Sequence, residues 1–329
     1  GGERTEKNSL RSEMGYRLED ARFGTLQQYL NPRTVDLGAV WERPAGPGDT
    51  PFRWGVVERK KGEYDWSEPD KYVKWCAENG KLPIAMIFPY AEWDQIEGYG
   101  GYYQRPPHDL EAYKKFVKLM VERYDGDGVD DMPGLKQPVK YWEVMNEVVP
   151  RPWGEKGEIW GFFNGTAEEY FKILKITYEA IKEADPEAKV LVAGIADMTI
   201  GNECKEFYSK VFKLGGAKYF DIANIHWIYN VKAFKEFLSA HNVSKPIWVT
   251  ETEFMQEWAG PHARDAESSV WSIVKAFGLG VEKIILVLGG EVLDNETGYQ
   301  AGKTMIAMLN YFDEVEKISD NCYKFTSKL

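Results

Sequence analysis

The sequence lacks three features that would place the chain at once in a large class of proteins. No apolar run approaches the roughly 20 residues that a membrane-spanning helix needs. The net charge of −11 at pH 7 gives a surface that repels phosphates, so no nucleic acid partner is expected. No glycine-rich motif of the GxGxxG or Walker type follows a predicted strand, which counts against nucleotide binding.

Cysteine is also scarce. Cys76, Cys204 and Cys322 lie far apart and form no CxxC pair, so neither a zinc site nor a disulfide framework is supported. We expect three buried thiols, and no metal or other cofactor. The chain begins with Gly1-Gly2 rather than Met, so the sequence does not tell whether a signal peptide was present. A secreted or cell-surface location therefore stays open. The oligomeric state is equally open.

Aromatic residues, in contrast, are abundant. They make up 14% of the chain and include 12 Trp, whose flat faces suit stacking against sugar rings. A tryptophan-rich core is the plain alternative. Apolar residues reach 43%, enough for a large core. The frequent Lys and Glu favour a thermophilic source.

Apolar runs and amphipathic stretches alternate from Phe23 onward. The predicted strands are Phe23–Tyr29, Thr34–Trp41, Leu82–Phe88, Val139–Glu147, Lys189–Gly194, Asp221–Trp227, Ile247–Thr250 and Lys283–Leu288. The predicted helices are Pro69–Glu78, Asp109–Tyr124, Thr166–Ala184, Lys205–Leu214, Val231–Leu238, Glu267–Phe277 and Thr304–Phe312. Such alternation implies a parallel sheet. About eight units in a chain of this length predict an α/β fold, a (β/α)8 TIM barrel, as one domain over 16–329 after a loose segment 1–15.

Two predicted strands deliver a glutamate where strand becomes loop. VKYWEVMNE ends in Glu147, and KPIWVTETEF carries Glu251 directly after its strand. Barrels of this class keep their chemistry at the C-terminal ends of the strands. Cleavage of a glycosidic bond requires two carboxyl groups. Glu147 and Glu251 are the two carboxyl groups that the sequence offers for such a reaction.

Four stretches together resemble retaining glycoside hydrolases of clan A, nearest to the xylosidase/iduronidase-like and cellulase-like families. They are LGAVWER (37–43), WGVVERKKGEYDW (54–66), YWEVMNE (141–147) and IWVTET (247–252). They resemble, in order, the family's second strand, its W-x-x-x-E-x-x-x-G-x-Y-D-W segment, its acid/base motif and its nucleophile motif. An Asn-Glu and a Thr-Glu at two strand ends about 100 residues apart form a specific signal.

The resemblance implies roles for individual residues. Glu147 becomes the acid/base and Glu251 the nucleophile, with carboxyl groups about 5–5.5 Å apart. Asn146 is expected to bind the sugar 2-hydroxyl, and Arg43 to keep Glu251 ionised, because a nearby cation lowers a carboxyl pKa. Arg43 is equally readable as a core ion-pair residue. The remaining residues expected at the substrate are His226, Tyr229, Trp227, Trp153, Trp54 and Trp258.

Three points stay open. The family carries a Tyr close after the strand-end His, whereas here Tyr229 comes one residue late, so either Trp227 or Tyr229 orients the nucleophile. The eighth strand ends in Gly289-Gly290 without the family's Trp, so Trp258 or Trp227 supplies the sugar-site floor or the site is open. The aromatic residues of the loop 89–107 are either sugar platforms or packing residues.

Two further glutamates lie close in sequence to Glu251 and Glu147. Glu253 shares the strand face of Glu251, but the family pattern favours Glu251 as nucleophile. Glu143 lies one layer deeper than Glu147 and is expected to pair with a buried basic group. Besides a hydrolase, a transglycosylase using the same two acids and a non-catalytic carbohydrate-binding barrel remain possible functions.

Overall fold

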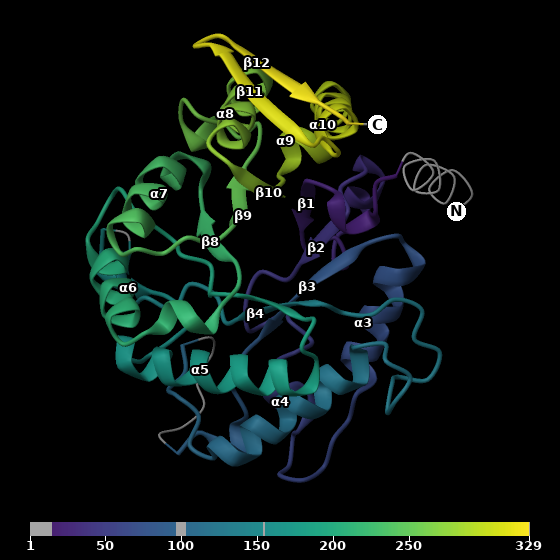
Figure 1. The fold of residues 1–329 in the computed structure, drawn as a ribbon, viewed down its shortest axis with the longest axis vertical. Helices are drawn as coiled ribbons and strands as arrows, with labels where there is room; N and C mark the ends of the chain where they lie inside the picture. Colours follow the sequence, from purple (N-terminus) through teal and green to yellow (C-terminus); the bar gives the residue numbers. More distant parts are fainter. Residues whose placement is uncertain (1–14, 97–102, 154, 329) are drawn as a thin grey trace.

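The computed structural model describes residues 15–96, 103–153 and 155–328. Eight parallel strands form one sheet in the order β7-β4-β3-β2-β1-β10-β9-β8. The outer strands of this order meet through isolated parallel bridges, Leu191 to Ile222 and Ile195 to Ile225. The sheet therefore closes into the predicted (β/α)8 TIM barrel, and Figure 1 shows the helices arranged around it. Nearly all of the segment 1–15 lies outside the described residues.

The elements follow the alternation expected from the sequence. The barrel strands are β1 (Phe23–Leu26), β2 (Trp41–Arg43), β3 (Leu82–Ile87), β4 (Tyr141–Val144), β7 (Lys189–Leu191), β8 (Ala223–His226), β9 (Ile247–Glu253) and β10 (Val281–Val287). The helices are α2 (Trp54–Val57), α3 (Ser67–Glu78), α4 (Leu110–Tyr124), α5 (Ala167–Ala184), α6 (Glu203–Lys213), α7 (Val231–Ala240), α8 (Ala266–Gly278), α9 (Gly290–Leu293) and α10 (Glu296–Leu309).

Two helices begin at the predicted caps. Asp109 accepts a hydrogen bond from the Ala112 backbone N–H at 3.0 Å, at the start of α4. Thr166 and Glu169 form the reciprocal capping box of α5, with bonds of 3.0 and 3.1 Å. These bonds satisfy backbone donors that the first helical turn leaves without partners. Both predictions are confirmed.

Several sequence-based boundaries were wrong. The predicted strand Thr34–Trp41 is largely the 3₁₀ helix η2 (Pro32–Leu37). Pro32 starts this turn, and Gly38 ends it with a left-handed φ of 92°, so the β-branched residues between them are not extended. Helix α10 begins eight residues before the expected Thr304. Cys322 is exposed in a strand that the sequence did not predict, whereas Cys76 and Cys204 are buried as expected.

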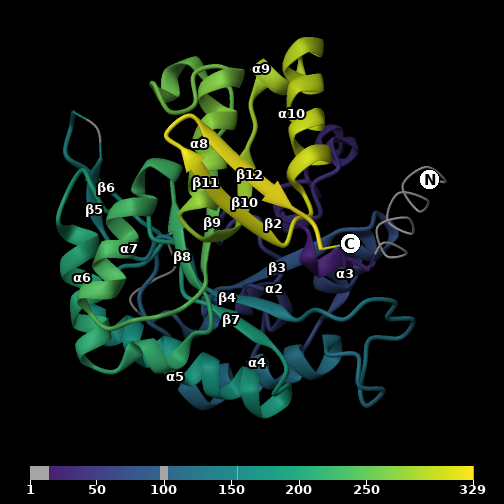
Figure 2. The ribbon, with the colours of Figure 1, turned by 45° about the horizontal axis from the view of Figure 1, so that its top comes forward.

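Two antiparallel hairpins were missed. One pairs β5 (Arg151–Trp153) with β6 (Glu158–Trp160), and the other pairs β11 (Glu314–Ser319) with β12 (Cys322–Thr326). The second hairpin packs on α8 through Tyr323 against Trp271 and Phe325 against Phe277. Figure 2 shows this yellow hairpin lying across the barrel wall beside α8.

The N-terminal end of the barrel interior is mostly apolar, and the buried ammonium of Lys283 lies over its Trp41 and Trp248 rings. Trp41, Tyr141 and Trp248 stand near the starts of their strands, with ring centroids 4.8 to 5.4 Å apart. Ile84, Leu191, Ile222 and Ile285 complete this buried layer. A packed layer of this kind closes the bottom of the barrel, so a ligand can reach the interior only from the C-terminal end.

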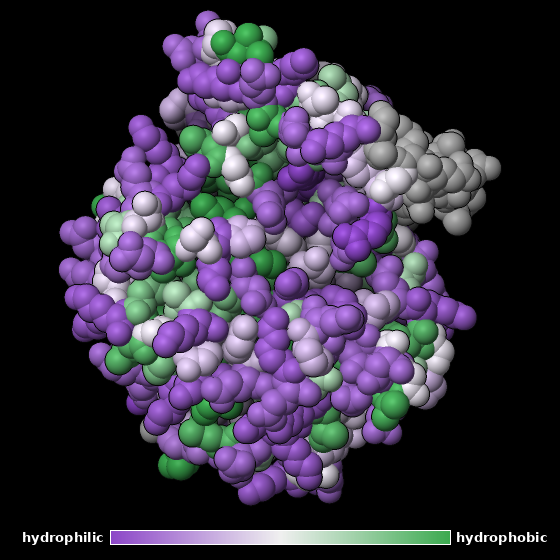
Figure 3. All heavy atoms as spheres, in the orientation of Figure 1, coloured by the Kyte–Doolittle hydropathy of each residue, from purple (hydrophilic) through white to green (hydrophobic). Residues whose placement is uncertain are grey.

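The face of the molecule drawn in Figure 3 is mostly polar. Figure 3 shows hydrophilic side chains over most of one face, with hydrophobic side chains in small scattered groups. Among the helices that the structure describes, none combines the length and apolar character needed to cross a membrane.

Candidate active site

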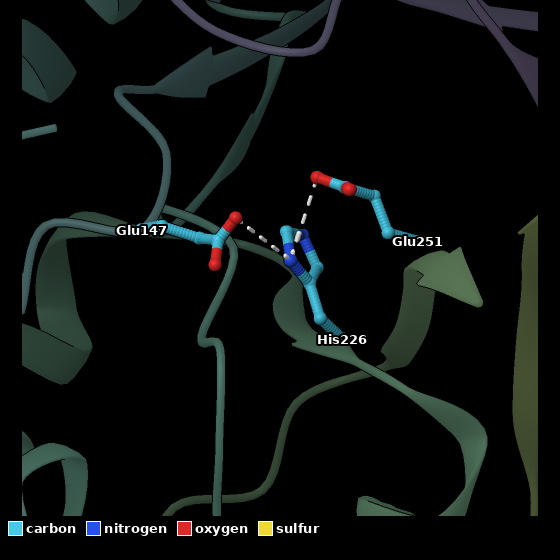
Figure 4. Close-up of side chains that lie close together, drawn as sticks. All are labelled: Glu147, His226 and Glu251. Atoms are coloured by element: carbon cyan, nitrogen blue, oxygen red, sulfur yellow. Dashed lines mark ion pairs between the residues drawn. The ribbon is translucent and has the colours of Figure 1, made fainter. Parts of the chain in front are cut away.

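The two glutamates singled out by the sequence lie together at the C-terminal end of the barrel. Glu251 belongs to β9, and Glu147 follows the end of β4 by three residues. One carboxylate oxygen of each, and Nδ1 of His226, lie within 4.8 Å of one another. Figure 4 shows both carboxylates directed toward the His226 ring from opposite sides. Three strands far apart in sequence thus place these groups in one buried cluster.

An unusual backbone conformation positions Glu147. Met145 and Glu147 have left-handed φ values of 68° and 42°, a region that non-glycine residues rarely adopt. The Glu147 N–H donates to the Gly194 carbonyl at 3.0 Å, and its carbonyl accepts from the Phe162 N–H at 2.9 Å. These two bonds hold a conformation that is costly by itself, as is common at functional sites.

Gly194 also makes room for the cluster. A Cβ at this position would lie 2.2 Å from His226 Nε2 and 2.6 Å from Asn146 Oδ1. Any larger residue at 194 would therefore displace one of these two buried side chains.

Arg43 connects the cluster to a deeper carboxylate. Its Nε and Nη2 donate to the two oxygens of Glu143 at 2.8 and 2.9 Å, and its Nη1 donates to Glu251 Oε2 at 2.9 Å. Nη2 also reaches Asn146 Oδ1 at 2.9 Å. Glu143 is therefore the buried partner of a basic group, as predicted. Charge-assisted, two-pronged bonds of this kind fix the orientation of both partners.

The surroundings of the two carboxylates favour different protonation states. Burial, followed by the negative charge of Glu251, raises the pKa of Glu147 to about 8, against opposing effects of Arg151 and Arg43. Burial also raises the pKa of Glu251, but the charge of Arg43 and hydrogen bonds from Arg43 and Asn146 act to lower it. Since Glu251 has the closer cation, the shared proton resides on Glu147 and the negative charge on Glu251.

His226 sits between the carboxylates as a neutral ring. Burial, with Arg43 and Arg151 adding to it, lowers the pKa of His226 well below its ordinary value. Nδ1 lies 3.4 Å from Glu251 Oε2 and 3.7 Å from Glu147 Oε2, without hydrogen-bond geometry to either. The dashed contacts of Figure 4 are therefore polar rather than ionic. The three groups have the donor types of a metal site, but a divalent cation there would be repelled by the adjacent Arg43 guanidinium.

The aromatic residues expected at the substrate differ from one another in burial and in surroundings. Trp54 is fully buried, donates from Nε1 to Glu58 at 2.8 Å and packs against Trp93. Its indole is enclosed by core residues and its donor is used by Glu58, so these contacts give its expected role in substrate binding no support, and that role stays a prediction. Trp258, in the 3₁₀ helix η6 (Glu257–Ala259), is 72% exposed and lines no buried floor. The backbone of Trp153 belongs to β5, and its side chain lies outside the described part of the structure.

Trp227 and Tyr229 follow β8 near Glu251. The Trp227 N–H donates to the Glu251 carbonyl at 2.8 Å. Tyr229, in the 3₁₀ helix η5 (Ile228–Asn230), is 38% exposed and its ring lies 5.0 Å from that of His262. Among the described hydrogen bonds, neither side chain reaches the Glu251 carboxylate, so which of them orients the nucleophile stays a prediction.

The loop after β3 is partly a packing element. Tyr90 is fully buried, and Trp93 donates from Nε1 to the Glu58 carbonyl at 2.8 Å. Tyr99 and Tyr102 lie outside the described residues.

The rival carboxylate Glu253 has a separate partner. It is mostly buried on β9, and its Oε2 lies 3.3 Å from Nε2 of His262. Glu253 thus has a histidine beside its carboxylate, where Glu251 has an arginine.

Sequence reasoning missed the partners that the β5–β6 hairpin gives to Glu147. Arg151 Nη2 lies 3.4 Å from Glu147 Oε1, and the Trp160 indole hydrogen-bonds the same carboxylate. Asn224 was also missed; its Nδ2 donates to Glu143 Oε2 at 2.7 Å. The only available signal was the position of Arg151 four residues after Glu147, in a segment that was expected to be a loop.

No protein-family model matches the sequence. The fold is similar to that of a glucosidase from Croceicoccus marinus, with 15% identity and a TM-score of 0.58 over 84% of this chain and 62% of that one. A family 39 glycoside hydrolase from Bacteroides cellulosilyticus WH2 gives 15% identity and a TM-score of 0.58 over 94% and 69%. A psychrophilic family 10 endo-beta-1,4-xylanase shares 15% sequence identity and a TM-score of 0.56, over 90% of this chain and 98% of the xylanase. The chain thus spans less than two thirds of the glucosidase, and at these identities the likeness establishes the fold.

Proposed function

We propose that this protein is a retaining glycoside hydrolase that cleaves β-glycosidic bonds of an oligo- or polysaccharide. The observation that carries the proposal is the pair Glu147 and Glu251, with one carboxylate oxygen of each within 4.8 Å of the other. The raised pKa of Glu147, caused mainly by burial, favours Glu147 as the acid. Retaining enzymes hold this pair about 5–5.5 Å apart, whereas inverting enzymes need about 6.5–9.5 Å to admit a water. The glycoside hydrolases among the proteins of similar fold add support.

In the first step, Glu251 attacks the anomeric carbon while the bond to the leaving oxygen breaks. The bonding electrons pass to that oxygen, which takes the proton of Glu147. A covalent bond now joins the sugar to Glu251, and Glu147 is a carboxylate. The acid is needed most when the leaving group is a poor one.

In the second step, the Glu147 carboxylate takes a proton from water. The water oxygen attacks the anomeric carbon, and Glu251 departs as a carboxylate. Loss of the negative charge of Glu251 in the intermediate lowers the pKa of Glu147, which allows the same residue to act first as acid and then as base. Two inversions at one carbon give net retention.

Asn146 and Arg43 support the nucleophile in this proposal. Arg43 holds Glu251 in its ionised form from 2.9 Å, and Asn146 Nδ2 lies 3.4 Å from Glu251 Oε2. We expect Asn146 to hydrogen-bond the sugar 2-hydroxyl, an interaction that strengthens as positive charge develops in the transition state.

A panel of aryl β-glycosides and polysaccharides tests the proposal. Proton NMR of the first product formed identifies the anomer before mutarotation, and the β-anomer is expected. Glu251→Gln is the matched control and should release no product. The α-anomer would contradict the retaining mechanism. Transfer of the glycosyl group to sugars in place of water would identify a transglycosylase, and saturable binding without turnover would identify a non-catalytic carbohydrate-binding barrel.

A further inference from the structure

We infer that Arg151 is an anion-binding position on the leaving-group side of the site, which makes the enzyme selective for glycosides whose leaving group carries a carboxylate. A uronic acid unit is the sugar of this chemistry. The inference rests on the proposed hydrolase function and adds a class of substrate to it.

Arg151 is a largely buried cation with unused donors. Its side chain is 18% exposed. Nη2 lies 3.4 Å from Glu147 Oε1, a long contact, and Nε is buried with no hydrogen-bond partner among the described residues. Arg43 differs, because its Nε, Nη1 and Nη2 are all engaged by buried acceptors. A guanidinium offers five donors in a planar fork, so Arg151 retains the capacity to bind a second group.

Among the described residues, the one ion pair of Arg151 is with Glu147, and it is lost when Glu147 is ready to act. A general acid must carry its proton, and a pKa of about 8 keeps Glu147 neutral at neutral pH. His226 is neutral too. Asp197, a carboxylate that acts on Cys204 together with Arg151, accepts hydrogen bonds from the backbone N–H groups of 199, 200 and 201. Buried charges in proteins are normally paired, so an anion brought by the substrate would supply the missing partner.

The two oxygens of Glu147 indicate the side on which this anion would lie. Oε2 lies 3.7 Å from His226 Nδ1, toward Glu251, whereas Oε1 lies toward Arg151. The sugar attacked by Glu251 occupies the first side. The group that departs with the proton of Glu147 therefore faces Arg151, and the exposed part of the Arg151 guanidinium can bind a carboxylate there.

Binding of such a carboxylate would also support the chemistry. Arg151 alone lowers the pKa of Glu147 and so opposes its protonation. A substrate carboxylate beside Arg151 cancels this effect. The acidic leaving group would thus strengthen the acid that releases it.

A matched pair of substrates tests the inference. The 3-carboxyphenyl and 3-carbamoylphenyl β-glycosides of an accepted sugar have the same shape but differ in charge. The wild-type kcat/KM should be about 10- to 100-fold higher for the carboxylate, as expected for a charged hydrogen bond. Arg151→Gln should bring this ratio close to one, while Arg17→Gln, which changes an exposed arginine, should leave it at the wild-type value. A wild-type ratio near one would overturn the inference.

A binding measurement separates this inference from the proposed function. In ¹⁵N-labelled protein, the Nε–H signal of Arg151 is identified by its loss in Arg151→Gln. D-glucuronate should shift this signal, and D-glucose should not. Absence of a shift with glucuronate would overturn the inference even if glycosides are hydrolysed. A shift in a protein that hydrolyses no glycoside would refute the hydrolase and support the anion-binding position.

Discussion

The two ends of the barrel interior are filled by opposite kinds of side chain. At the N-terminal end, Trp41, Tyr141 and Trp248 pack with aliphatic residues. At the C-terminal end, Arg43, Glu143 and the cluster around them are equally buried but charged. The same eight strands support both layers.

The contrast between the two layers distinguishes side chains that stabilise the fold from side chains that are expected to perform the chemistry. Apolar burial is favourable at about 25 cal/mol per Å² without any special geometry. Burial of an ion pair often fails to repay its desolvation, even with good hydrogen bonds. The charged layer at the C-terminal end of the barrel, called the upper layer below, therefore stabilises the fold less than an apolar layer would. Its presence favours a role in chemistry. Substitutions in the two layers should accordingly have different consequences.

The largest effect is expected at the nucleophile. Glu251→Gln should lower kcat by about 10⁴-fold or more, since no group remains to form the covalent intermediate. Glu253→Gln, two residues along the same strand face, should only weaken turnover. Steady-state kinetics on an aryl glycoside compares the two variants. A greater loss of kcat in Glu253→Gln would show that Glu253, two residues further along β9, is the nucleophile.

Arg43→Met should destabilise the fold most among changes in the upper layer. It leaves Glu143 buried without its cation, and such losses cost about 3–5 kcal/mol. Urea denaturation measures the change in the free energy of unfolding. Arg43→Lys keeps the charge but loses the two-pronged contact and should cost less. A loss below about 1 kcal/mol for the Met variant would show that the network does not support the fold.

The pH dependence of kcat/KM should show an alkaline limb near pH 8. Glu147 acts in its protonated form, so activity falls about tenfold per pH unit once pH rises above the Glu147 pKa of about 8. A dinitrophenyl glycoside provides the control, because its leaving group departs without a proton and the alkaline limb of its glycosylation step should vanish. An unchanged limb for both substrates would assign it to another group.

The smallest effect is expected in the apolar layer. Ile84→Val should cost about 0.5–1.5 kcal/mol of stability through one lost methylene group. It should leave the pH profile of kcat/KM unchanged. Thermal unfolding and the same kinetic assay measure the two quantities. A shifted pH profile would show that the two layers are coupled.

The sequence predicted the parts of the molecule that local patterns encode. Alternating strands and helices, the caps at Asp109 and Thr166, and a glutamate at each of two strand ends all follow from short stretches. Packing between distant segments is not encoded in this way. The composition could not tell the buried Trp54 from a sugar platform, and no pattern connected Trp160 to Glu147. The β-branched residues Thr34 and Val35 between Pro32 and Gly38 suggested a strand, but the two flanking residues set a tight turn instead.

The division of roles between the two acids is tested most directly by azide. In Glu147→Ala, a dinitrophenyl glycoside should still form the intermediate, and azide, which needs no base, should release a glycosyl azide of retained configuration. In Glu251→Ala, azide should occupy the space of the nucleophile and give a product of inverted configuration. Swapped configurations would reverse the two assignments. Failure of azide to rescue either variant would contradict catalysis by this pair and favour a barrel that only binds sugar.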